Sequence, residues 1–218
     1  MRIAEMTAFT VLVAAGIAGS ASAAVIDNVS ALGSSTVRIN FETNGAGAPI
    51  VLIQGATQVL PANEYASLGV IFDRDLKWVN DGNALFDAAQ TLQGSPVTAI
   101  PSSQINTFTI NFTIPVYGVG FNVINNDVLA TSAPVFVANY AGGGSETATW
   151  GSQFKDNVLA NTVSYGFMGF SGSRAITSIT VTKSAATLDD LTFTSVPSPA
   201  GLAVAGVAGV LASRRRRA

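Results

Sequence analysis

The chain has 218 residues, enough for one ordinary domain with short appendages, and it contains no cysteine and no histidine. This composition excludes a disulfide framework, a thiolate nucleophile, the Ser-His-Asp and Cys-His catalytic arrangements, and nitrogen-ligated metal sites. The formal net charge is -2, yet residues 24–195 alone carry twelve acidic and six basic residues. A central region this acidic is a poor electrostatic match for nucleic acid.

The first 23 residues have the layout of a secretory signal peptide. Arg2 supplies a weakly basic start, residues 6–18 are uncharged and mostly apolar, and Ala21 and Ala23 form a small-residue A-x-A cleavage site. A buried N-terminal helix is the alternative, but the stretch has no polar face at the helical period. We therefore expect residues 1–23 to form a signal helix that is removed after Ala23.

The central region alternates apolar and polar side chains with the period of a β-strand. Residues 107–113 and 116–123 both follow this pattern, and Pro115 between them predicts a break and hence a pair of strands. Their inward-facing residues are predicted to be Phe108, Ile110, Phe112, Tyr117, Val119, Phe121 and Val123.

Shorter runs with the same alternation occur on either side of this pair, at residues 37–42, 135–140, 178–182 and 190–195. Turn sequences rich in Asn or Gly, at 125–127 and 141–144, separate the later runs. Such a series of short strands with polar outer faces predicts an antiparallel β-sandwich. One helix is predicted within it, over residues 83–94, with Asn83 as its cap.

The segment 73–87 gathers four aspartates around Trp78. It does not fit the EF-hand template, because Lys77 occupies a position that requires an oxygen ligand. Trp78 could offer a sugar a stacking face, with Asp81 and Asn83 as hydrogen-bonding neighbours. A half-buried tryptophan in a solvated loop is the alternative interpretation.

The chain ends in an apolar run followed by a block of arginines. Residues 196–213 carry no charge over 18 residues, within the roughly 17–25 needed to cross a bilayer, and the arginines Arg214, Arg215, Arg216 and Arg217 follow at once. The positive-inside rule places these arginines in the cytoplasm. The run is mostly Ala, Gly and Val, so the transmembrane helix predicted over 199–213 suits transient rather than permanent anchoring.

This three-part ending resembles the PEP-CTERM sorting signal. The motif position holds Val196, Pro197, Ser198 and Pro199, with Ser198 where the family has glutamate. The resemblance implies recognition by an exosortase-type membrane protease, cleavage near the motif, and delivery to the cell surface or extracellular matrix of a bacterium that makes exopolysaccharide. A plain C-terminal membrane anchor is the alternative.

Residues 41–195 also resemble the β-sandwich domains often found ahead of such a tail. The shared features are a first strand ending in "FE", the segments "YASLGVIF" and "VGFNV", a "GFMGFSGSRAITSITV" hairpin, and a last strand "LDDLTF". These domains belong to the jelly-roll or galactose-binding-like group. The resemblance implies carbohydrate binding in many members and a structural calcium between the first and last strands in some.

Three carboxylates form the best oxygen cluster for such a cation. Glu42 ends the first core strand, and Asp189 and Asp190 begin the last one. Because the first and last strands of a jelly roll commonly lie side by side, these groups predict a calcium site. In the alternative, Asp190 points to water and Asp189 caps a turn.

Together these features predict a signal peptide at 1–23, a β-sandwich at 24–195 and a sorting tail at 196–218. We expect an exported, non-catalytic surface or matrix protein that either binds carbohydrate, such as exopolysaccharide, or has a structural role. The alternative is a secreted, glycoside hydrolase-like enzyme acting on polysaccharide, which needs two carboxylates about 5–10 Å apart. The sequence brings no particular pair together.

Overall fold

The computed structural model describes residues 23–53, 55–80, 90–93, 106–125, 133–151, 153, 157–159, 163–183 and 186–195. Within these residues the protein is mainly β, every strand pairing is antiparallel, and no helix is long and apolar enough to span a membrane. The strands are β1 (Ala24–Ile26), β2 (Val37–Ile39), β3 (Thr57–Leu60), β4 (Val70–Phe72), β5 (Leu76–Asn80), β6 (Gln90–Gln93), β7 (Asn106–Asn125), β8 (Val135–Tyr140), β9 (Ser145–Thr149), β10 (Asn157–Leu159), β11 (Val163–Lys183) and β12 (Ala186–Thr194). Two short 3-10 helices, η1 (Val29–Leu32) and η2 (Ala66–Leu68), complete the elements.

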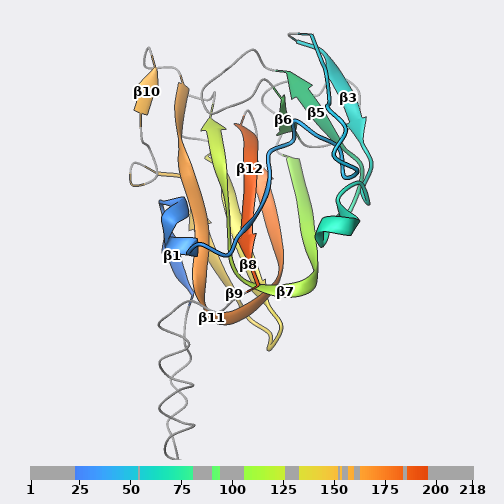
Figure 1. Ribbon diagram of the computed structural model, residues 1–218. Helices are drawn as coiled ribbons and strands as arrows, with labels where there is room; N and C mark the ends of the chain where they lie inside the picture. The colour runs from blue at the N-terminus through green and yellow to red at the C-terminus, as the bar shows by residue number, and fades with distance from the viewer. Residues whose placement is uncertain are drawn as a thin grey trace, which may run out of the picture.

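The two longest strands, β7 and β11, build both layers of the fold. Each turns through the bottom of the molecule in Figure 1 and runs back up on the other side. The second half of β7 pairs with the first half of β11 and with β12, whereas the first half of β7 pairs with the second half of β11 and with β4. The first layer thus contains the second half of β7, the first half of β11 and then β12, β6, β5 and β3. The second layer contains the first half of β7, the second half of β11, and β4, β8 and β9. The result is a sandwich-like arrangement in which bent strands cross from one sheet to the other.

The bend in β7 lies where the sequence predicts a break. Pro115 lies inside β7, and the pairing with β11 skips from Val116 opposite Ile176 to Asn111 opposite Ser178. Proline lacks the backbone N–H needed for a regular ladder, but a bulge has no such requirement. The predicted strand pair at 107–123 is therefore wrong, because the two halves form one continuous strand and pair with β11 rather than with each other.

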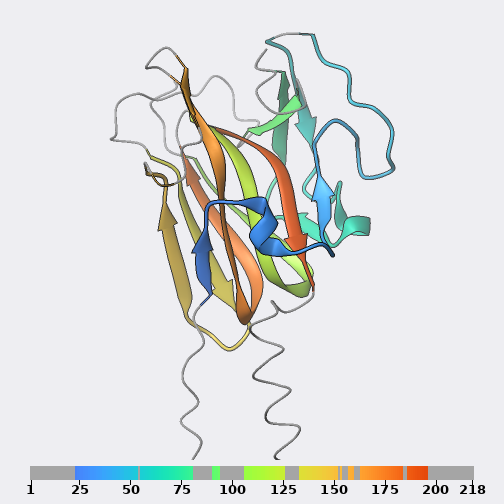
Figure 2. The same ribbon diagram turned by 60° about the vertical axis from the view of Figure 1, so that its left-hand side comes forward.

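A corresponding bend in β11 shows that a second prediction is wrong. The sequence 166–181, expected to form a hairpin, lies within the single strand β11, whose register shifts between Ser171 and Ile176. Glycine and serine at 171–173 favour a turn in a linear reading of the sequence. In the folded chain these residues lie at or next to the register shift of β11, and Figure 2 shows from a second direction how β11 bends between the layers.

The predicted helix over 83–94 is also wrong at its C-terminal end. Residues 90–93 form strand β6, which pairs with β5 and meets β12 where Leu92 lies opposite Leu188. Tertiary pairing overrides the helical spacing of the apolar residues there. The remainder of the predicted helix lies outside the described residues, as do residues 1–22 of the signal helix predicted over 1–23 and the tail at 196–218.

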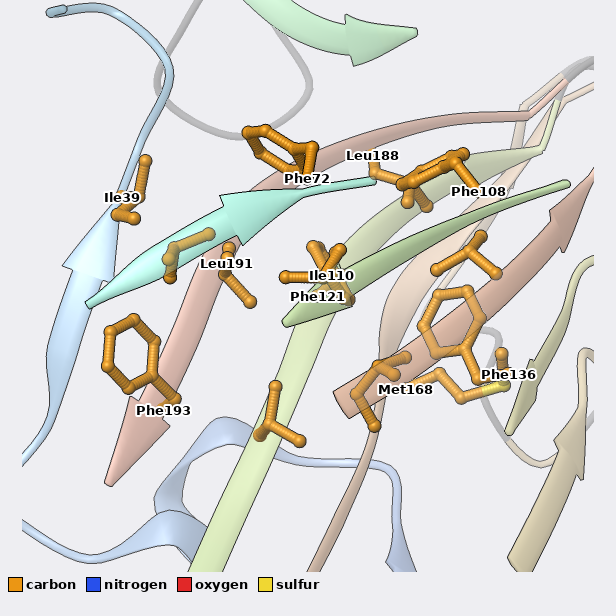
Figure 3. Packing of buried hydrophobic residues seen from close by; sticks show 14 of the residues in the cluster. Ile39, Phe72, Phe108, Ile110, Phe121, Phe136, Met168, Leu188, Leu191 and Phe193 are labelled. Atoms are coloured by element: carbon orange, nitrogen blue, oxygen red, sulfur yellow. The ribbon is translucent and has the colours of Figure 1, made fainter. Parts of the chain in front are cut away.

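The core lies between the two layers and contains most of the predicted inward-facing residues. Phe108, Ile110, Phe121 and Val123 are each at most 1% exposed, whereas Tyr117 is only partly buried. Figure 3 shows side chains from β7, β8, β11 and β12 directed toward one another. The rings of Phe121 and Phe136 pack edge to face across the layers, with centroids 5.4 Å apart.

The outer face of the first layer departs from the prediction of a wet surface. Gly118 and Gly120 alternate with the predicted inward-facing residues and therefore belong to the outer face, but Leu32 of η1 covers Gly118 and the Phe167 ring covers Gly120. All nine residues of β12 are buried. Glycine at these positions lets covering groups approach the backbone of β7 closely.

Candidate functional site

A buried polar site of the described chain is formed around Asp190. Its Oδ1 accepts a hydrogen bond from Nε of Arg38 at 2.6 Å, and its Oδ2 accepts one from Nδ2 of Asn122 at 2.7 Å. Asp190 is 4% exposed, while the Arg38 side chain is 47% exposed and reaches in from the surface. The carboxylate is thus held by one cationic and one neutral donor, from β2 and β7.

A β-bulge in β12 positions this carboxylate. The pairing of β12 with β7 moves from Asp189 opposite Asn122 to Thr192 opposite Gly120, so β12 has one extra residue here. Asp190 takes the left-handed conformation with φ of 51°, and its backbone N–H donates to Asp189 Oδ1 at 2.7 Å. Aspartate adopts this conformation more often than most residues with a side chain, and here the Asp189 carboxylate holds the Asp190 backbone N–H.

The predicted calcium ligands do not converge in the structure. Asp189 and Asp190 are buried, as a cation site would require, but both oxygens of Asp190 bind protein donors. Glu42 lies beyond the end of β2, where its carbonyl accepts from the Ile50 amide. Within the described ranges, which include all three residues, no group of three or more carboxylates is arranged to hold a metal ion.

Trp78, the predicted stacking residue, is part of the core. It is 2% exposed, and its Nε1 donates to the hydroxyl of Tyr65 at 3.1 Å. That hydroxyl in turn donates to the Thr43 carbonyl at 2.7 Å. The indole therefore presents no free face to solvent, in contrast to the predicted sugar-binding role, and it is more buried than the alternative half-buried position. Its proposed partners Asp81 and Asn83 lie outside the described residues.

Tyr65 links this part of the core by its ring as well as by its hydroxyl. Its ring packs edge to face with Phe41, Phe72 and Trp78 at centroid distances of 5.8, 6.5 and 6.4 Å. Burial raises the pKa of the phenol well above its ordinary value, and the negative charges of Glu64 and Glu42 add to this, against a lowering by the Trp78 hydrogen bond. At neutral pH the phenol is therefore protonated, in keeping with its hydrogen bond to the Thr43 carbonyl.

A second polar cluster, which no sequence motif indicates, lies at the β8–β9 turn. The Tyr140 hydroxyl donates to Glu146 Oε2 at 3.0 Å, and the Arg174 guanidinium carbon lies 3.8 Å from the centre of the Tyr140 ring. Burial, with the hydrogen bond and charge of Glu146, raises the pKa of Tyr140 to about 12. The predicted turn 141–144 folds β9 back on β8, where Glu146 lies opposite Ala138 and is therefore a diagonal neighbour of Tyr140 on the same face.

Of the predicted cleavage and sorting residues, only Ala23 lies within the described residues. Ala23 is described and is 0% exposed, whereas Ala21 is not described. The motif Val196, Pro197, Ser198 and Pro199, the predicted helix 199–213 and the arginines 214–217 also lie outside the described residues. The sorting prediction thus stays a prediction from sequence.

Comparison of the chain with known protein families, proteins and structures does not assign a function to these sites. No family model, no curated protein and no solved structure matches the chain significantly. In the Asp190 and Tyr140 clusters the polar groups hydrogen-bond to other groups of the protein and pack closely against them. Such interactions are typical of polar groups that stabilise a fold.

Proposed function

We propose that this chain is an exported bacterial surface or extracellular-matrix protein with a non-catalytic role, sorted through its C-terminal tail. The observation that carries the proposal is the uncharged run 196–213 followed directly by four arginines. Its length suits a single membrane crossing, and the arginines provide a cytoplasmic stop. The apolar leader at 1–23 supports the same topology.

Within this proposal we favour a structural role over saccharide binding. The tryptophan with the best sequence context for sugar stacking is buried and hydrogen-bonded inside the core. The buried carboxylate of Asp190 is likewise engaged by Arg38 and Asn122. We also propose that the fold belongs to the jelly-roll or galactose-binding-like group, and the two-layer antiparallel arrangement supports this assignment.

The sorting proposal is tested by following the tail in cells. The full chain is expressed in a bacterium that has an exosortase-type protease and in the same strain without that protease, and the recovered protein is analysed by intact mass. We expect the tail to be lost in the first strain only. Retention of residues 200–218 in both strains would leave a plain anchor and overturn the sorting proposal.

Matched tail variants separate charge from sequence. Replacing all four arginines 214–217 by lysine keeps the positive stop and should preserve membrane retention before cleavage. Replacing them by glutamine removes the charge and should let the weakly apolar helix pass through, releasing uncut protein into the medium. Equal behaviour of the two variants would show that the arginines are not a topological stop.

The choice between structural and binding roles is tested with a glycan array. The secreted protein and its Trp78→Phe variant, which retains an aromatic core residue, are applied to a panel of bacterial exopolysaccharides. We expect no retention of either protein on the panel. Saturable binding that Trp78→Phe abolishes would overturn the structural role and establish the saccharide-binding alternative.

A further inference from the structure

Ala23, the last residue of the predicted leader, belongs to the folded domain. Its side chain is 0% exposed and lies in the same core cluster as Tyr140 and Ile176. The next residues form β1, which pairs with β11 from Ala24 opposite Ser171 to Ile26 opposite Gly169. The core therefore includes Ala23, the residue that the predicted cut between Ala23 and Ala24 would remove with the leader.

The nitrogen of Ala23 lies at the Tyr140 cluster. A backbone hydrogen bond from Ala23 lowers the pKa of Tyr140, whose hydroxyl donates to Glu146 Oε2 at 3.0 Å. Arg174 lies over the ring face instead, with its Nη2 donating to the Gly143 carbonyl at 2.6 Å. The nitrogen of Ala23 is thus linked through the Tyr140 hydroxyl to the Glu146 carboxylate.

The position of the cut decides whether this arrangement survives. Cleavage of the Ala23–Ala24 bond would remove a fully buried methyl group and the amide that donates to Tyr140. Cleavage one bond earlier would keep both. It also places small residues, Ser20 and Ser22, at the two positions that leader peptidases require to be small.

We propose that the leader is cut at the Ser22–Ala23 bond, and that the α-ammonium released on Ala23 binds the Tyr140 hydroxyl and the Glu146 carboxylate. Hydrolysis adds water across the bond: the Ser22 carbonyl carbon takes the hydroxyl, and the Ala23 nitrogen takes the proton. With an ordinary α-amino pKa of roughly 7.7–8.0, that nitrogen is mostly cationic at neutral pH. A cation at this partly buried position is compensated by the adjacent carboxylate. The inference rests on the proposed export.

The first measurement locates the cut. The full chain is expressed with its own leader in a bacterial host, and the exported protein is analysed by intact mass and N-terminal peptide sequencing. We expect Ala23 as the first residue. A first residue of Ala24 or Ser22 would overturn the inference, whereas a chain that keeps residues 1–22 intact would instead overturn the export proposal on which it rests.

The second measurement tests the ammonium site in the exported protein. Acetylation of the N-terminal amine is followed by peptide mapping in native and urea-unfolded protein, with the ε-amine of Lys77 as an internal reference. We expect the native N-terminus to react at least about tenfold more slowly than the unfolded one. Equal rates after normalisation to Lys77 would overturn the site.

Two variants assign this protection to the carboxylate. Glu146→Gln should lose most of it, while the matched control Asp27→Asn, which removes an exposed carboxylate close in sequence, should keep it. Equal protection in both variants would overturn the role of Glu146. Should Glu146→Gln fail to fold, Tyr140→Phe supplies the same test, because it removes the intervening hydroxyl and keeps the charge.

Discussion

The polar cluster at Asp190 provides the sharpest test of how the fold is held. Replacing Asp190 with alanine removes both acceptors, for Arg38 Nε at 2.6 Å and for Asn122 Nδ2 at 2.7 Å. A hydrogen bond to a charged group contributes roughly 1.5–3 kcal/mol to stability. Because the Arg38 side chain is 47% exposed and regains water, its part of the loss falls at the low end. We expect Asp190→Ala to cost about 3–4 kcal/mol.

The left-handed backbone of Asp190 distinguishes two contributions to that loss. Glycine adopts a φ of 51° without steric cost, whereas alanine does not. Asp190→Gly should therefore be less destabilising than Asp190→Ala by about 1 kcal/mol, although both lose the same hydrogen bonds. Asp190→Asn suits the left-handed backbone and keeps one acceptor oxygen, so we expect the smallest loss of the three.

The assay is urea unfolding of the three variants and the parent protein, followed by tryptophan fluorescence and far-UV circular dichroism. The two signals should coincide, which allows the free energy of unfolding to be extrapolated for each variant. The expected order of stability is parent, asparagine, glycine, alanine. A loss below about 1 kcal/mol for Asp190→Ala, or glycine less stable than alanine, would refute the reasoning.

Three further predictions concern the core. Gly169→Ala should cost about 1–3 kcal/mol in thermal unfolding, because the new methyl carbon would lie 2.7 Å from the Gly120 Cα, whereas Gly142→Ala, with nothing within 4 Å, should stay within about 0.5 kcal/mol. Trp78→Ala should cost about 3–5 kcal/mol, and a loss below about 1 kcal/mol would show an exposed ring. The pKa of Tyr65 is higher in the folded protein than its value of about 10 in the unfolded chain, so above pH 10 the unfolded chain loses this proton first. The contribution of the buried phenol to the free energy of unfolding is therefore complete below pH 10 and declines as pH rises above it. The melting temperature should fall above pH 10 less steeply in Tyr65→Phe than in the parent protein, and equal slopes would contradict this account.

The period of two in the sequence was sufficient to predict the fold class. Phe108, Ile110, Phe121 and Val123 were placed in the core from alternation alone, and each is at most 1% exposed. Alternation identifies buried faces because successive side chains of a strand point to opposite sides. The same pattern contains no information on strand length, so it predicts a break at Pro115 although β7 continues through that residue.

The candidate sites were less predictable, because each depends on residues distant in sequence. The sequence grouped Asp189 and Asp190 with Glu42, whereas the fold places Arg38 and Asn122 at Asp190, across 152 and 68 positions. A bulge in β12 decides this by turning Asp190 toward donors on neighbouring strands. Local composition cannot indicate a bulge, since it depends on how two strands align.

The sequence by itself determined the acidic β-rich character of the domain, the chemistry excluded by the lack of cysteine and histidine, and the two ends on which the export proposal rests. These properties follow from composition and local periodicity, which require no tertiary contact. Only the tertiary structure decided that β7 and β11 bend between layers, that Trp78 is buried, and that Ala23 belongs to the core. Such features arise from pairing between distant segments, where the gain from burying apolar surface and satisfying hydrogen bonds outweighs local preference.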